Sequence, residues 1–269
     1  MVATLRRMDF ETLIVERSGG IARLTLHRPD AANGINLRMS EELLVAATSF
    51  ADDPSVRAVL LTGAGARFCG GGDVKGFATL GDGLGHHIRE ITVPLHAAIS
   101  QLVRLDAPVI CAVQGSAAGA GMGFVASSDI VIAAESAKFV MAYTGIGLTP
   151  DGSSSWFLPR LVGVRRALEL AITNRALSAA EALDWGIVTQ VVPDDALTAT
   201  AEALAETIAA GPTLAYGGAK RLMHGSLEHT LDQHLALESE EMARAGRSAD
   251  GIEGVAAFVE KRAAYFRGA

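Results

Sequence analysis

Two glycine-rich segments could bring bare backbone close to a ligand. The first is Phe68–Asp73 (FCGGGD), and the second runs from Gly115 to Gly123 (GSAAGAGMG). Each follows a predicted strand, and a junction of strand, glycine and helix leaves unpaired N–H groups at the positive end of a helix dipole. Two such junctions can converge on one oxygen and stabilise negative charge there as an oxyanion hole. The alternative is that the glycines only allow a helix to pack closely on a strand.

These segments do not match the two common phosphate-binding motifs. Gly119 and Gly121 are followed three residues later by Phe124 rather than by glycine, so the dinucleotide pattern GxGxxG is not completed. No Gly-Lys-Ser/Thr sequence occurs, which excludes a P-loop. Neither segment is therefore interpreted as a nucleotide site.

A carboxylate and a histidine could supply acid–base chemistry. Asp151 follows Pro150 and precedes a helical pattern, so it is either a turn or N-cap residue or a general acid, base or nucleophile. His96 lies in a predicted helix among apolar residues, where a structural role is the more common one. The other histidines and the two cysteines, Cys69 and Cys111, lack the spacing of a metal site. We expect no metal and two reduced, buried thiols.

Composition indicates a globular chain and excludes some partners. The chain has 269 residues, of which 49% are hydrophobic and 20% charged, and its net charge is −7. This negative charge disfavours non-specific nucleic-acid binding, which requires a basic face. No run of about 18 apolar residues predicts a membrane span, and Met1–Asp9 lacks the apolar core of a signal peptide. We expect a cytoplasmic protein without nucleic-acid or membrane partners.

The apolar pattern predicts an α/β core followed by helices. A β-hairpin is expected from Thr12–Glu16 and Ile21–Leu26. Four apolar runs typical of a covered sheet predict strands at Val56–Thr62, Val109–Val113, Ile130–Ala133 and Val188–Val192. Helical periodicity predicts helices at Met39–Phe50 with Ser40 as N-cap, His86–Leu105, Leu197–Ile208, Leu214–His224, Leu227–Ala245 and Gly251–Phe266. We expect residues 1–193 to form the core, and residues 194–269 to form helices that either pack on it or mediate oligomerisation.

Taken together, these segments resemble the crotonase superfamily, which has the enoyl-CoA hydratase/isomerase fold. The resemblance extends from Arg28 to near Arg262 and is most specific in RPDAAN at 28–33, Phe68–Asp73, Pro108–Asp129 and Ala137–Gly186. It implies a spiral of ββα turns, followed by C-terminal helices that assemble a homotrimer or a hexamer of paired trimers. It also implies an acyl-CoA thioester substrate, with coenzyme A as part of that substrate and no permanently bound cofactor.

The resemblance also assigns roles to individual residues. The backbone N–H groups of Gly72 and Ala120 would form the oxyanion hole of the family. Removing a proton alpha to a thioester places negative charge on the carbonyl oxygen, which these two donors would stabilise. Contacts with coenzyme A would come from Arg28, Ala31, Ala32, Gly70 and Asp73, and from Phe258, Lys261 and Arg262 of a neighbouring subunit.

The sequence departs from the hydratase pattern of this family. Hydratases use two glutamates, at the positions that Gly123 and Tyr143 occupy here. Hydration requires groups that orient and deprotonate water and deliver a proton to the alpha carbon. Neither glutamate is present, so simple hydration of an enoyl-CoA is not expected.

Asp151 instead occupies the position of an essential aspartate in two other branches. One is similar to the phenylacetate-pathway enoyl-CoA isomerase, where Asp151 would move a proton along the acyl chain and Tyr143 would shape the acyl pocket. The other is similar to 4-chlorobenzoyl-CoA dehalogenase, where Asp151 would attack the aromatic ring and His96 would activate water. That dehalogenase has tryptophan at the position of Tyr143. We favour the isomerase; a relative that binds acyl-CoA without catalysis is the third hypothesis.

Overall fold

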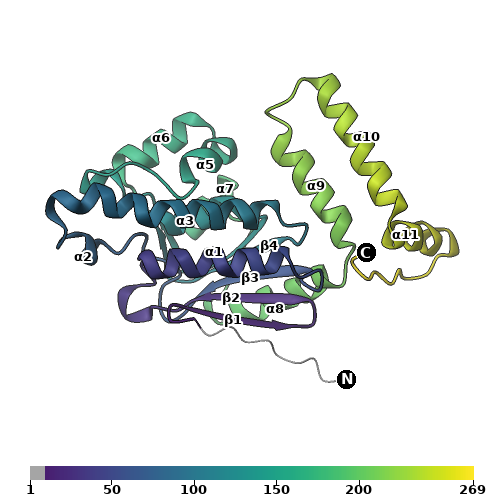
Figure 1. Ribbon diagram of the computed structural model, residues 1–269, viewed down its shortest axis with the longest axis horizontal. Coiled ribbons are helices and arrows are strands. Elements are labelled where there is room, and N and C mark those ends of the chain that lie inside the picture. Colours follow the sequence, from purple (N-terminus) through teal and green to yellow (C-terminus); the bar gives the residue numbers. More distant parts are fainter. Residues whose placement is uncertain (1–9) are drawn as a thin grey trace.

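The computed structural model describes residues 10–269 as a core of sheets and helices with a helical arm at one end (Figure 1). The prediction for Met1–Asp9 lies outside the described residues. The core is built on a six-stranded sheet with the order β1-β2-β3-β4-β6-β9. Its strands are β1 (Leu13–Ser18), β2 (Ile21–Leu26), β3 (Ala58–Gly63), β4 (Val109–Val113), β6 (Ile130–Ala134) and β9 (Gln190–Val192).

This large sheet starts with the predicted hairpin and continues with parallel strands. β1 and β2 pair antiparallel, with Leu13 opposite Leu26, and every later neighbour pairs in parallel. All the predicted strands are present, but β3 and β9 each begin two residues later than the predicted Val56 and Val188. The N–H groups of Ile187 and Val188 bond back to the carbonyl of Ala182, so these residues form a turn before the strand.

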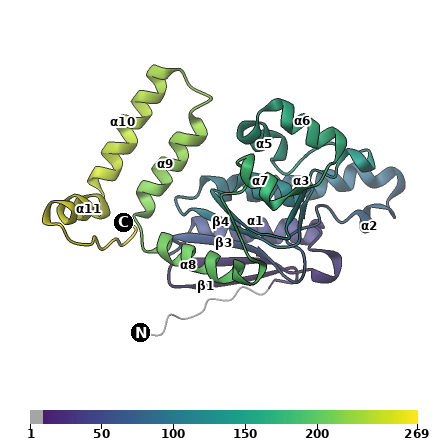
Figure 2. The same cartoon turned by 180° about the vertical axis from the view of Figure 1, so that it is seen from behind.

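Alternate residues of the central strands bury both faces of the large sheet. In β3, Val59 and Leu61 belong to one core cluster, whereas Ala58 and Leu60 belong to the other. α1 (Leu37–Ala51) and α3 (Leu84–Arg104) cover the first face in Figure 1, and α8 (Leu197–Ala209) covers the second face, seen in Figure 2. Strands buried on both faces read as continuous apolar runs, which is why the sequence predicted them.

A second sheet has three strands in the order β5-β7-β8. They are β5 (Ser116–Ala118), β7 (Lys138–Val140) and β8 (Leu177–Ser178). Isolated bridges add Cys69 opposite Ala117 and Ile35 opposite Gly72. From β3 to β7 the chain therefore visits the large sheet and the small sheet in turn, which is the spiral of ββα units that the resemblance implied.

The start of α1 differs from the prediction. Asn36, not Ser40, is the N-cap, because the Asn36 side-chain oxygen accepts a hydrogen bond from the Met39 N–H at 2.9 Å. Ser40 lies inside the helix, where its hydroxyl donates to the Leu37 carbonyl. The other core helices are α2 (Val74–Phe77), α4 (Ala120–Ser127), α5 (Ser154–Val162), α6 (Val164–Thr173) and α7 (Ala179–Asp184).

The last three helices form an arm that projects from the core (Figures 1 and 2). They are α9 (Thr213–Gly225), α10 (Leu231–Arg247) and α11 (Ala249–Glu260). α10 begins later than the predicted Leu227 because Thr230 and Gln233 form a capping box. α11 ends at Glu260, before the predicted Phe266, because the next residue, Lys261, takes a left-handed conformation with φ of 55°. The predicted boundary at residue 193 stays a prediction, since α8 follows it and packs on the large sheet.

Candidate active site

The two glycine-rich segments lie side by side as neighbouring strands. Cys69 pairs in parallel with Ala117 through hydrogen bonds of 3.1 and 2.9 Å. Two residues further along, Gly71 lies against Gly119, and Gly72 and Ala120 are the next residues of the two segments. The strand register therefore brings together the two residues that the resemblance assigned to an oxyanion hole.

Close approach of these segments requires glycine at several positions. Gly71 and Gly119 have φ of 95° and 52°, and a Cβ on Gly119 would lie 3.2 Å from the Gly71 Cα. A Cβ on Gly121 would lie only 2.6 Å from the Cys69 carbonyl oxygen. The packing interpretation of these glycines is thus correct, and the same close packing brings the backbones of the two segments into contact.

The N–H groups of Gly72 and Ala120 donate no hydrogen bond to any residue from 10 to 269. Ala120 is the first residue of α4, where an N–H has no acceptor within the helix. Around Gly72, the Ile35 N–H donates to the Gly71 carbonyl and the Asp73 N–H donates to the Ile35 carbonyl, which leaves the Gly72 N–H between them unused. Two free donors, one of them at a helix N-terminus, can stabilise a negatively charged oxygen.

Both residues line a cavity of about 330 Å³, which we call the first cavity. Three predicted site residues, His96, Tyr143 and Asp151, line it as well. One of its walls comes from Val74 and Phe77 of α2 and from the first half of α3. The apolar side chains of the lining include Phe77, Ile88, Ile91, Leu95, Ile146 and Leu148.

Asp151 reaches the first cavity from a loop that crosses the start of α4. A Cβ on Gly152 in this loop would lie 3.4 Å from the Ala120 Cα. Gly123 of α4 meets the same loop, since a Cβ on Gly123 would lie 2.0 Å from the Gly152 carbonyl oxygen. A glutamate side chain at position 123 is therefore incompatible with this backbone. The Asp151 side chain is 29% exposed.

Of the two structural alternatives for Asp151, the helix N-cap is wrong and the turn is correct. Ser153 precedes the first residue of α5, and no side chain caps that helix. The backbone carbonyl of Asp151 accepts the N–H of Ser154 at 3.1 Å and its hydroxyl at 2.7 Å. The turn is thus closed by the backbone of Asp151, and its carboxylate takes no part in it.

His96 holds the Asp151 loop through one ring nitrogen. Its Nε2 accepts a hydrogen bond from the Gly152 N–H at 3.2 Å and lies 4.0 Å from Asp151 Oδ2. A ring nitrogen that accepts an N–H carries no proton, so neutral His96 has its proton on Nδ1. His96 and Asp151 are therefore neighbours in the site without an ion pair in this arrangement.

Tyr143 closes the other side of the Asp151 loop. Its hydroxyl donates to the Asp151 carbonyl oxygen at 3.2 Å, and the residue is 9% exposed. Burial raises the pKa of Tyr143 far above its usual range, and the nearby Asp151 carboxylate raises it further. Tyr143 is thus a neutral hydrogen-bond donor and cannot replace a catalytic carboxylate.

The segments assigned to coenzyme A contact one another beside the first cavity. Arg28 forms an ion pair of 2.9 Å with Asp73, and the Gly70 N–H donates to the Ala32 carbonyl at 2.8 Å. Ala31 is exposed and Ala32 half-buried. Gly70 itself lines the first cavity. The structure thus brings these five residues to one side of the cavity.

Asn33 was missed as a key residue of this region. It is fully buried, and its Nδ2 donates to the carbonyls of Ala64, Arg67 and Phe68, while its Oδ1 accepts the Arg28 N–H. Asn33 therefore ties the RPDAAN segment to the strand that leads into the glycine-rich turn. Its place at the end of that motif was the only signal in the sequence.

Phe258, Lys261 and Arg262 are not brought to the first cavity of the same chain. They lie on or just after α11, which sits at the opposite end of the molecule from α2 (Figures 1 and 2). Phe258 is 85% exposed, and Arg262 pairs with Glu253 and Glu260. A role at an acyl-CoA site would require a neighbouring subunit.

Comparison with known proteins decides the family. The chain matches the family described as Enoyl-CoA hydratase/isomerase over residues 16–269. The chain belongs to the enoyl-CoA hydratase/isomerase family. It is 42% identical to the 1,2-epoxyphenylacetyl-CoA isomerase of Escherichia coli (strain K12) over 265 residues, which cover 97% of this chain and 99% of that protein.

Two further proteins are similar to this chain over most of its length. The 4-chlorobenzoyl coenzyme A dehalogenase-2 of Arthrobacter sp is 36% identical over 217 residues, which cover 80% of this chain and 78% of that protein. The crystal structure of an enoyl-CoA hydratase from Polaromonas sp. JS666 superposes with a TM-score of 0.90 at 32% identity, covering 95% of this chain and 99% of that one.

Membership of the enoyl-CoA hydratase/isomerase family confirms the predicted fold class and makes this chain an acyl-CoA enzyme of that family. Between residues 10 and 269, no helix is long and apolar enough to cross a membrane, and no three His, Cys, Asp or Glu side chains form a metal-binding group. Cys69 and Cys111 are free and buried, as predicted, and burial raises the pKa of Cys69 to about 12.

Proposed function

We propose that this enzyme isomerises an enoyl-CoA, with Asp151 moving a proton between two carbons of the acyl chain. The observation that carries the proposal is that Asp151 lines the same cavity as the unpaired N–H groups of Gly72 and Ala120. A thioester oxygen bound to these two donors would present its alpha carbon to the carboxylate. The apolar wall from α2 and α3 would hold the acyl group.

The proposed reaction balances with one carboxylate. Asp151 takes a proton from the alpha carbon of a 3-enoyl-CoA, and the electron pair delocalises onto the thioester oxygen to give a dienolate. The N–H groups of Gly72 and Ala120 bind that oxygen and contribute about 3–4 kcal/mol each, as oxyanion-hole donors do. Protonated Asp151 then returns the proton to the gamma carbon, which moves the double bond into conjugation with the thioester.

Two features of the first cavity support isomerisation over hydration. The loop that carries Asp151 occupies the space that a side chain at position 123 would need. Tyr143, at the other position where hydratases of this family have glutamate, is a buried neutral phenol. Water would then lack the two carboxylates that activate it and protonate the alpha carbon.

The test is turnover of trans-3-hexenoyl-CoA, followed by absorbance of the conjugated thioester product. Asp151→Asn removes the base without changing the size of the side chain, and we expect it to lower kcat by at least about 10²-fold. Calorimetry with saturated hexanoyl-CoA should show that the variant still binds the thioester. Activity above a few per cent of the wild-type value would remove Asp151 from this role.

A hydrolytic aryl-CoA dehalogenase is the second candidate, and the 4.0 Å distance from His96 Nε2 to Asp151 Oδ2 favours it. Asp151 would attack the ring, displace halide and form an aryl ester, which water activated by His96 would hydrolyse. Against this role, the Nε2 lone pair is already used by the Gly152 N–H. A covalent aryl adduct trapped on His96→Gln with 4-chlorobenzoyl-CoA, detected by its mass, would favour dehalogenation over isomerisation.

We also propose the coenzyme A contacts and the assembly that the family resemblance implies. Arg28, Ala31, Ala32, Gly70 and Asp73 would contact the coenzyme A part of the substrate. Phe258, Lys261 and Arg262 would reach the site of a neighbouring subunit in a trimer or hexamer, which light scattering would detect. Acyl-CoA binding without turnover of either thioester would indicate a relative that has lost catalysis.

A further inference from the structure

A second, larger cavity lies on the other side of Asp151. Its volume is about 700 Å³, and Asp151 and His96 line both cavities. It is bounded by the C-terminal half of α3, by residues 150–157 and by α9, with apolar side chains that include Ile99, Val103, Leu105, Trp156 and Phe157. Asp151, to which the proposed function assigns the proton transfer, thus borders both cavities.

We propose that this second cavity binds the distal part of the acyl group, so that the enzyme acts on apolar acyl chains longer than hexenoyl. The inference rests on the proposed function. The alpha to gamma carbons must lie between the N–H donors and Asp151, because Asp151 exchanges protons with both ends of that segment. The next carbons of the chain therefore start beside Asp151, which also lines the second cavity.

Volume decides which cavity receives the rest of the chain. The first cavity, at about 330 Å³, is at the lower limit for a small-molecule site. It must already hold the thioester, the reacting carbons and the adjoining end of the pantetheine arm. The second cavity has about 700 Å³, well within the range of ligand sites. A long acyl chain fits the pair of cavities and exceeds the first one alone.

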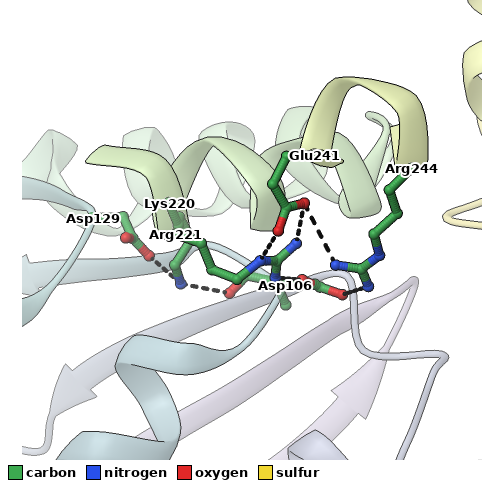
Figure 3. Close-up of polar contacts among 7 residues, drawn as sticks. Asp106, Asp129, Lys220, Arg221, Glu241 and Arg244 are labelled. Atoms are coloured by element: carbon green, nitrogen blue, oxygen red, sulfur yellow. Dashed lines mark hydrogen bonds and ion pairs between the residues drawn. The ribbon is translucent and has the colours of Figure 1, made fainter. Parts of the chain in front are cut away.

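The charges in the wall formed by α9 are already paired, which suits an uncharged ligand. Lys220 is 9% exposed and forms an ion pair of 2.7 Å with Asp129 (Figure 3). Arg221 pairs with Glu241 and with Asp106. Paired side chains present their aliphatic stems to the cavity without requiring a charged partner from the ligand. Of the remaining charged lining residues, Arg104 and Glu228 are exposed to solvent.

The same ion pairs hold α9 in place as a wall. Arg221 of α9 joins Asp106, which follows α3, to Glu241 of α10, and Arg244 of α10 contacts both acids (Figure 3). Across the cavity, the His224 ring packs edge-on against Phe157 of α5 at 5.6 Å between centroids. The second cavity is therefore built between fixed elements of the core and the arm.

α3 offers a matched pair of variants, since one helix lines both cavities. Ser100→Phe would fill the second cavity, whereas Ile88→Phe would fill the first. The readout is the ratio of kcat/KM for trans-3-dodecenoyl-CoA to that for trans-3-hexenoyl-CoA. We expect Ser100→Phe to lower this ratio at least about tenfold, because even one methylene that loses its pocket is worth about that much. Ile88→Phe should lower both rates and leave the ratio within about threefold of the wild-type value.

The proposal is wrong if Ser100→Phe leaves the ratio unchanged or if only Ile88→Phe lowers it. Val103→Phe repeats the test if Ser100→Phe does not fold. Calorimetry with saturated hexanoyl-CoA and dodecanoyl-CoA separates this inference from the proposed function. Loss of the extra affinity for dodecanoyl-CoA in Ser100→Phe supports the subsite even if no enoyl-CoA is isomerised. A changed molecular mass by light scattering with an unchanged preference would assign the cavity to a contact between copies instead.

Discussion

Ala120 allows one oxyanion donor to be removed with little cost to the helix that carries it. Ala120 is the first residue of α4, where proline is tolerated because the N–H has no acceptor within the helix. The preceding Gly119 has φ of 52° and no Cβ, so the usual clash of a proline ring with the preceding side chain is absent. Ala120→Pro therefore deletes the proposed donor and leaves α4 able to form.

The expected loss follows from the geometry of the two donors. Removing one oxyanion-hole donor costs about 2.7–4 kcal/mol of transition-state stabilisation, or about 10²–10³ in kcat. The proline ring would also take the space next to this nitrogen, where a bound oxygen would lie, so its steric effect acts in the same direction. We expect kcat on trans-3-hexenoyl-CoA to fall at least about 10²-fold. The assay is the absorbance of the conjugated product at saturating substrate.

The same substitution at a remote helix start is the control. Ala249 is exposed and is the first residue of α11, and Ser248 before it has φ of −72° and ψ of 155°, which suit a residue that precedes proline. Ala249→Pro should melt within a few degrees of the wild type and keep its activity. If Ala120→Pro is folded and retains kcat within about tenfold of the wild type, the N–H of Ala120 does not stabilise the transition state and the reasoning is refuted.

Three further variants test other parts of the site. Asn33→Ala removes the donor to the carbonyls of Ala64, Arg67 and Phe68, of which only Phe68 is a buried residue. One buried carbonyl then lacks a partner, so we expect about 1–3 kcal/mol of lost stability in chemical denaturation; a change below about 0.5 kcal/mol would contradict this. Gly123→Glu should lower the melting temperature without producing hydration of crotonyl-CoA, because a Cβ would lie 2.0 Å from the Gly152 carbonyl oxygen; a stable variant that hydrates this thioester would show that the loop can move aside. Tyr143→Phe should lower kcat/KM by less than about tenfold, the effect of losing one neutral hydrogen bond. Burial and the Asp151 carboxylate raise the pKa of Tyr143, so the phenol stays neutral at pH values up to its ordinary pKa of about 10. The pH profiles of the wild type and of Tyr143→Phe should therefore coincide up to that pH. A loss of activity at alkaline pH that only the wild type shows would mean that Tyr143 ionises in this range.

The sequence predicted those elements whose signal is local. Strands such as β3 and β4 are apolar on both faces, and the hairpin at Gly19 and Gly20 has a turn sequence between alternating residues. The start of α1 was predicted wrongly because Asn36 and Ser40 are both good N-cap residues. The choice between them depends on the backbone of Ile35, which pairs with the distant Gly72.

The site itself could be predicted only in part, because its geometry depends on contacts between distant segments. Glycine content indicated close backbone approach, but the pairing of Cys69 with Ala117, which sets Gly72 beside Ala120, has no local signal. The hydrogen bond from the Gly152 N–H to His96 likewise joins a loop to a helix far away in the chain. Family resemblance supplied those residues, and the structure supplies their arrangement.

The contact between Gly123 and the carbonyl of Gly152 makes two placements of a catalytic acid mutually exclusive. A side chain at position 123 and the present path of residues 150–153 cannot coexist, since both require the same space. With this backbone, a carboxylate can stand at position 123 of α4 or on the loop above it, but not at both places. The type of reaction would then depend jointly on glycine at position 123 and on the backbone path of residues 150–153. A single substitution at either place could not change the reaction. An attempt to redesign this enzyme as a hydratase should therefore begin with the loop backbone, and only then with its acidic residues.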